Sequence, residues 1–91
     1  MYVRELYGDK VEFAGLIANG RVFRGDKGRY VTFLTLGVGN GQYIDITIKK
    51  PFSYSDHDVV WGQGTIRHSN NSDYVECYDY QAHRLEKFTK A

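Results

Sequence analysis

A short basic segment carries the side chains with the clearest chemical potential. Residues 19 to 30, read NGRVFRGDKGRY, contain one carboxylate, Asp26, and four cations: Arg21, Arg24, Lys27 and Arg29. Phe23 lies among them. Cations at this spacing can follow a line of phosphates, and a flat ring beside them can stack on a base. The segment therefore predicts a polyanion-binding loop, with a merely solvated hairpin as the alternative.

The chain as a whole is nearly neutral and rich in rings. Its 91 residues carry a net charge of +1, and eight tyrosines, five phenylalanines and one tryptophan make up 15% of the composition. Near-neutrality argues against a protein that coats duplex DNA through its overall positive charge. Rings beyond those that a small core needs are available for stacking at the surface.

Strands must position these groups, because no segment shows a 3.6-residue apolar period over three turns. Alternation and turn composition predict five strands, at residues 10–18, 29–39, 42–50, 59–68 and 73–85. Pro51 ends the third strand because it has no amide donor for the ladder, and residues 51–59 hold at most one helical turn. We expect one all-β domain over residues 1–91, a small five-stranded OB-fold Greek-key barrel. The barrel covers about residues 10–88, with residues 1–9 as an N-terminal extension.

Alternation also predicts which rings face outward. Ile44, Ile46 and Ile48 pointing inward place Tyr43, Asp45, Thr47 and Lys49 outside. On the second strand, Leu34 and Leu36 pointing inward leave Val31, Phe33 and Thr35 outside. Phe33 then forms a stacking platform, and the alternatives are a flipped register that buries Phe33 and an ordinary half-buried Tyr43.

Further candidates lie on the last two strands. Trp61, Arg67 and His68 belong to the fourth strand, and Tyr74 follows the SNNS turn. We expect them to close a groove from the side opposite the basic loop. Trp61 has a second interpretation as a core residue, because lone tryptophans often anchor small barrels.

Catalytic, metal-binding and membrane functions find little support. The ligand-type residues Asp56, His57 and Asp58 are adjacent in sequence and do not converge as a tetrahedral site requires, and His68 and His83 have no paired cysteines. No nucleophile–base motif or phosphate loop is present. No apolar run approaches the roughly 18 residues of a membrane span, and the single cysteine, Cys77, favours a reducing compartment. We expect a cytoplasmic protein that is not an enzyme and holds no metal or cofactor.

Several short motifs resemble those of the single-stranded DNA-binding proteins of bacteria, their phages and mobile elements. These are VEFAGLIA at residues 11–18, VTFLTLG at 31–37, YIDITI at 43–48 and the WGQGTIR segment, where Trp61, Gly64, Ile66 and Arg67 match. The matching glycine in WGQGTIR would let a barrel strand turn a corner. Two features depart from the family, since its usual helix is reduced to SYSDHD and its acidic tail is replaced by RLEKFTKA.

The resemblance implies a sequence-tolerant binder of single-stranded DNA that protects exposed strands in replication or recombination. The departures favour a minimal version from a phage or mobile element. We expect a homodimer or higher homo-oligomer, with YVRELY at residues 2–7 as a possible contact. RNA binding and a protein-interaction module, such as a subunit of a primosome-like complex, remain alternatives.

Overall fold

The computed structural model describes residues 1–70, 72–78 and 80–85, and within them the protein is built from strands. In chain order these are β1 (Tyr2–Tyr7), β2 (Lys10–Arg24), β3 (Tyr30–Gly39), β4 (Gln42–Ile48), β5 (Val59–His68), β6 (Asp73–Cys77) and β7 (Ala82–Leu85). The short 3₁₀ helix η1 (Asp26–Gly28) is the one helical element in this part of the chain. The all-β expectation is confirmed.

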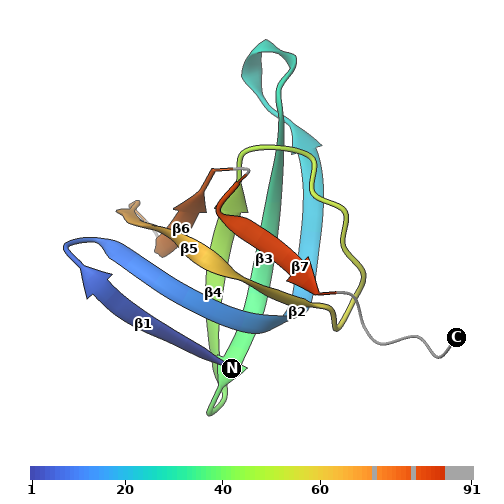
Figure 1. Cartoon of the computed structure of the whole chain (residues 1–91). Helices are drawn as coiled ribbons and strands as arrows, with labels where there is room; N and C mark the ends of the chain where they lie inside the picture. The colour runs from blue at the N-terminus through green and yellow to red at the C-terminus, as the bar shows by residue number, and fades with distance from the viewer. Residues whose placement is uncertain (71, 79, 86–91) are drawn as a thin grey trace, which may run out of the picture.

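Five of the strands form a ring (Figure 1). Around the ring the order is β2, β3, β4, β6 and β5, and pairing between β5 and β2 completes it. β4 and β6 run parallel, whereas the other neighbours in the ring are antiparallel. β1 and β7 lie outside the ring, on β2 and β5 respectively. β2 is 15 residues long, so its first half pairs with β1 and β5 and its second half with β3.

The apolar core fills the inside of the ring. It is made of side chains that alternate along the strands: Val11, Phe13, Ile17, Leu34, Leu36, Val38, Ile46, Ile48, Val60, Val75, Cys77 and Ala82. The predicted inward positions on β3 and the two later isoleucines of β4 are confirmed, and Ile44 packs against the core from a half-buried position. Phe52 from the connection between β4 and β5 completes the cluster.

The buried hydroxyl of Thr32 fixes that connection to β3. It donates a hydrogen bond to the carbonyl oxygen of Lys50 at 2.7 Å and accepts one from the amide of Phe52 at 3.0 Å. A buried polar group with both functions satisfied stabilises the fold, and here it holds the segment after Pro51 against the ring. No described residue of this segment is helical.

Three sequence-based boundaries were wrong. Residues 19–24 are strand rather than loop, because they pair with residues 30–35 and extend β2 and β3 into a long hairpin. Residues 73–85 form two strands, because a turn links the amide of Gln81 to the carbonyl of Tyr78. The third strand ends at Ile48 instead of residue 50.

Residues 1–9 form β1 and its turn, although they stay outside the ring as expected.

Glycines allow one tight turn and one close strand contact in this fold. Asn40 and Gly41 have φ of 56° and 73°, the left-handed pair that a two-residue hairpin turn requires between β3 and β4. Gly64, in the WGQGTIR segment, lies on β5 at the start of its antiparallel pairing with β6. A Cβ at that position would lie 2.5 Å from a Val75 methyl carbon and 2.7 Å from the Glu76 carbonyl oxygen. The glycine is therefore needed for strand-to-strand contact.

Candidate functional site

A row of side chains crosses the outer face of the ring from β2 to β6. Arg21 on β2 pairs with Phe33 on β3, Phe33 pairs with Thr47 on β4, and Thr47 pairs with Glu76 on β6. Directly paired residues project to the same side of a sheet. Since Leu34, next to Phe33, points into the core, the row lies on the outer face.

Phe33 is the centre of an aromatic platform on this face. Its ring stacks on that of Phe23, with centroids 4.6 Å apart and an interplanar angle of 16°. The guanidinium of Arg21 lies 5.6 Å from the centroid of Phe23, within reach of a cation–π contact. Phe33 is half-buried and Phe23 is exposed, so the pair is supported from below and accessible from outside.

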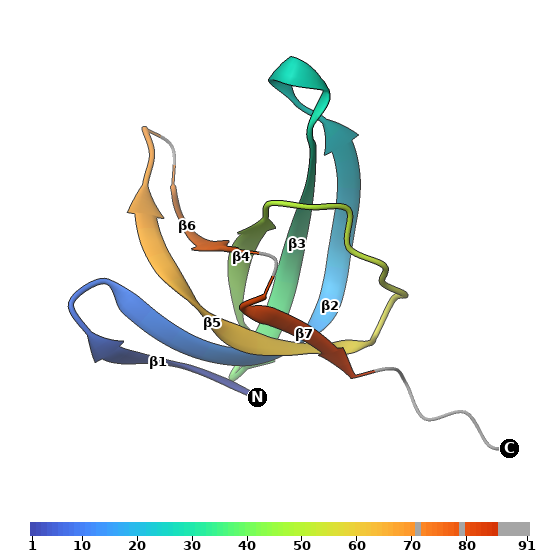
Figure 2. The same cartoon turned by 45° about the horizontal axis from the view of Figure 1, so that its top comes forward.

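The platform belongs to a groove made of three adjoining hollows. The first is bordered by Arg21, Phe33 and Tyr74, and the second also contains Phe33 and Tyr74, together with Phe23, Arg29, Tyr30 and Lys49. The third continues past Tyr74 to Tyr43. Tyr74 lines all three hollows, so they adjoin one another at this residue. Figure 2 shows the β2–β3 and β5–β6 hairpins rising on the same side of the ring, with β4 between them.

The groove floor carries a hydroxyl without a partner. Thr47 lies on the outer face, as expected. Its side chain is nevertheless only 6% exposed, because its neighbours on this face cover it. Its Oγ1 makes no hydrogen bond with any described residue. A buried hydroxyl left without a partner is unfavourable, so this one is available to a ligand that reaches the floor.

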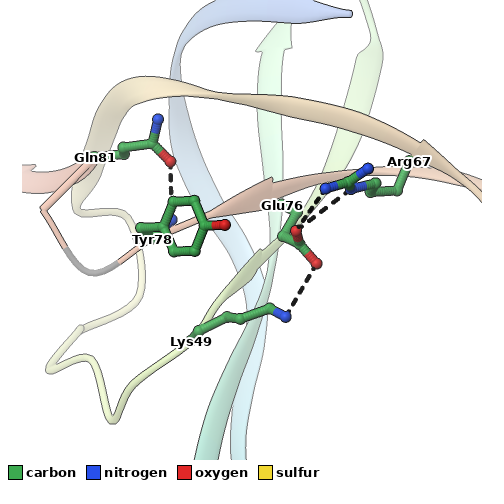
Figure 3. Close-up of polar contacts among 5 residues, drawn as sticks. All are labelled: Lys49, Arg67, Glu76, Tyr78 and Gln81. Atoms are coloured by element: carbon green, nitrogen blue, oxygen red, sulfur yellow. Dashed lines mark hydrogen bonds and ion pairs between the residues drawn. The ribbon is translucent and has the colours of Figure 1, made fainter.

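Two of the predicted cations are joined to a carboxylate. Lys49 Nζ lies 3.2 Å from Glu76 Oε2, and the Arg67 Nε and Nη2 atoms each lie 3.3 Å from Glu76 Oε1 (Figure 3). Both cationic side chains remain about half exposed, at 51% and 52%, whereas Glu76 is 16% exposed. Lys49 therefore faces the groove, and Arg67 lies on the other side of Glu76, each with its charge partly neutralised.

A second ion pair lies at the end of the β5–β6 hairpin. His68 Nδ1 is 2.7 Å from Asp73 Oδ1. The hydrogen bond to Asp73 and the charge of that carboxylate raise the pKa of His68 above its ordinary value of 6.5. The His68 imidazole, paired with Asp73, therefore stays protonated to higher pH than a free histidine would.

Seven of the twelve predicted site residues line the groove: Arg21, Phe23, Arg29, Phe33, Tyr43, Lys49 and Tyr74. Arg67 does not line the groove but forms an ion pair with Glu76, and His68 lies at the end of the adjacent hairpin. Arg24 and Lys27 are exposed at the end of the β2–β3 hairpin, where the Arg24 guanidinium lies over Gly28.

Trp61 lies apart from the groove. It is 47% exposed, so the core interpretation was wrong, and its ring stacks on that of His83 on β7 with centroids 4.4 Å apart. The hollow beside it is bordered by Tyr2, Tyr80 and Gln81, none of which lines the groove. Trp61 therefore faces a second surface.

Comparisons with known proteins found no match. No family model, no curated protein and no solved structure matches the chain. Any functional conclusion thus depends on the geometry of the groove.

Sequence reasoning missed two acidic residues of the groove, Asp45 and Glu76. Asp45 accepts a hydrogen bond from the hydroxyl of Thr35 at 2.8 Å. The alternation of the buried residues Val75 and Cys77 is the sequence signal that places Glu76 outside, on the same face as Tyr74.

The described residues also lack two other kinds of feature. Among them, no group of three or more His, Cys, Asp or Glu side chains could hold a metal ion. No helix in the same part of the chain is long and apolar enough to cross a membrane.

Proposed function

We propose that the protein binds single-stranded nucleic acid, DNA in the first place, with little sequence preference. The observation that carries the proposal is the Phe23–Phe33 stack, which lies open in a groove beside Tyr74 and three cations, Arg21, Arg29 and Lys49. A single strand exposes base faces and phosphates together, and this surface offers flat rings for the first and cations for the second. Stacking accepts every base, so sequence tolerance follows.

We further propose that the ring is an OB-type Greek-key barrel. β2, β3 and β4 are consecutive neighbours, and β5 returns after a long connection to lie beside β2, which is the order of a Greek key. OB-folds bind oligonucleotides on the face of their second and third strands and on the loops that flank it. In this ring those elements are β3, β4 and the β2–β3 and β5–β6 turns, where the groove lies.

The Thr47 hydroxyl gives a second reason to expect a ligand in the groove. It is more than nine-tenths buried and unpartnered among the described residues, and it borders the same hollow as Phe33 and Tyr74. A hydroxyl can donate or accept, so it can meet the edge of any base that stacks above it. Its position on the floor supports base contact as well as phosphate contact.

The small size and near-neutral charge of the chain support binding as an assembly. A groove with few free cations on a domain of 10.5 kDa offers few phosphate contacts, so one copy would hold a strand weakly. We propose that copies bind side by side, as a homodimer or a higher homo-oligomer, and protect exposed strands in replication or recombination. RNA of the same length would use the same rings and cations.

Titration of a fluorescently labelled oligo-dT strand tests the proposal. Fluorescence anisotropy should rise with protein concentration, and the dissociation constant should increase between about 50 mM and about 200 mM salt, because counterions are released from the phosphates. Labelled duplex DNA of the same length is the matched control and should bind more weakly, since its bases cannot stack on Phe33. An oligo-rU strand decides the preference between DNA and RNA. Unchanged anisotropy at high protein concentration would refute the proposal.

A protein-interaction module is the second candidate, and β1 is the observation that favours it. This strand is at the open edge of the sheet, and its exposed side chains include Val3, Leu6 and Tyr7. Edges of this kind can accept a strand from another chain. A protein that ignores every oligonucleotide but pairs through β1 would belong to this class.

A further inference from the structure

We propose that Glu76 competes with nucleic-acid phosphates for Lys49 and Arg67 and so limits the affinity of the groove. This inference rests on the proposed function, because it concerns the regulation of the same site. Glu76 belongs to the row of side chains on the outer face and borders the groove together with Phe33 and Tyr74.

The geometry places one carboxylate between two cations that are distant in the sequence. Lys49 follows β4, Arg67 lies on β5, and Glu76 on β6 is between them (Figure 3). Each carboxylate oxygen is used, Oε2 for Lys49 at 3.2 Å and Oε1 for Arg67 at 3.3 Å. These are the same donors that a phosphate group would need.

Glu76 cannot move aside as freely as the cations can. Its side chain is 16% exposed and its backbone is held in β6 between β4 and β5, whereas Lys49 and Arg67 are about half exposed on long side chains. An arriving phosphate therefore has to draw the cations away from the carboxylate and also approach a fixed negative charge. Both effects weaken binding.

A role in stability does not account for the arrangement. Ion pairs with half-exposed cations contribute little to folding, because water and salt screen them. Removing the charge of Glu76 should therefore leave the fold intact while it frees two cations for the ligand.

The Arg4–Glu12 ion pair provides a matched control. Glu12 is similarly enclosed, with a side chain 24% exposed, and it is also paired with an arginine. Glu12 lies on β2 beside the hollow of Trp61, and its partner Arg4 borders the third hollow, which contains neither Phe23, Phe33 nor Lys49. Glu12→Gln and Glu76→Gln change the net charge of the protein by the same amount, so their difference isolates the position of the carboxylate.

The experiment is oligo-dT titration of the wild-type protein, Glu76→Gln and Glu12→Gln at several salt concentrations. We expect Glu76→Gln to bind about 5-fold to about 25-fold more tightly at about 0.1 M salt, with a salt slope more negative by about 0.7 to about 1.4, which corresponds to one or two released cations. Glu12→Gln should stay within about 2-fold of the wild type. Equal effects of the two variants, or weaker binding by Glu76→Gln, would overturn the inference while the proposed function stands. If the wild type and Glu76→Gln both fail to bind, the proposed function is refuted, and the inference with it.

A double-mutant cycle keeps the test independent of any single variant. Lys49→Gln should weaken binding less in the wild type, where Glu76 shares that cation, than in the Glu76→Gln background. Additive effects would contradict the competition. Glu76→Asp is the substitute variant if Glu76→Gln does not fold. Its shorter side chain withdraws the carboxylate from both cations, so it should also tighten binding.

Discussion

The stacking platform leads to a prediction in which Phe33 and Tyr74 are both changed to leucine. Leucine keeps an apolar side chain where each ring is half-buried but removes the flat face. The two rings come from β3 and β6 and border the same two hollows, so they can contact neighbouring bases. Stacking contributes about 1 to about 3 kcal/mol per base, hence about 2 to about 6 kcal/mol for the pair. The dissociation constant for oligo-dT should therefore increase by a factor between about 30 and about 10⁴.

The assay is the anisotropy titration at fixed salt, accompanied by urea unfolding of the same protein. Loss of the Phe23 stack should lower the free energy of unfolding by about 0.5 to about 1.5 kcal/mol, too little to unfold the domain. Tyr80→Leu is the control, because Tyr80 is 71% exposed beside Trp61 and away from the groove. A folded double variant with wild-type affinity would refute the stacking argument. An equal loss of affinity in Tyr80→Leu would indicate that the strand binds on the Trp61 face instead.

Three other predictions concern single groups. Thr47→Val should raise the free energy of unfolding by up to about 1 kcal/mol in urea titrations, because it removes an unpartnered buried hydroxyl, and should weaken oligo-dT binding. Burial raises the pKa of the Cys77 thiol to about 12. Thiol reagents should therefore label it only after unfolding, and the free energy of unfolding should fall as pH rises above about 9, where the unfolded thiol alone ionises. Asp73→Asn should return the pKa of His68 toward 6.5 in an NMR titration, since the hydrogen bond and charge of Asp73 raise it. The His68–Asp73 interaction should stabilise the folded state below about pH 6.5 and be lost as the pH rises through the raised value.

The sequence predicted best where one face of a strand is buried. Leu34 and Leu36 are buried, so period two places Phe33 outside, and the flipped register that would bury Phe33 was wrong. The same reasoning holds for Ile46 and Ile48 on β4. The groove was predictable to the extent that its rings alternate with core residues.

Elsewhere local sequence signals led to wrong predictions. Arg21 and Arg24 suggested a loop, but the end of a hairpin that faces water on both sides tolerates charge at every position of its strands. Around Trp61 the inward positions belong partly to glycine, since Gly62 and Gly64 are buried, so the apolar alternation that would have placed the tryptophan outside was weak. The pairing of Glu76 with Lys49 and Arg67 joins residues that lie far apart in the sequence, so no local pattern predicts it.

The closure of the ring constrains how the chain can be made. One edge of residues 10–16 pairs with residues 59–65, and one edge of residues 46–48 pairs with residues 75–77. A nascent chain leaving the ribosome therefore carries exposed strand edges until most of its length has emerged, and pairing across such separations is slow. Synthesis and folding cannot proceed in step for this protein, and a chaperone that shields those edges would shorten the interval in which unfinished copies can join one another.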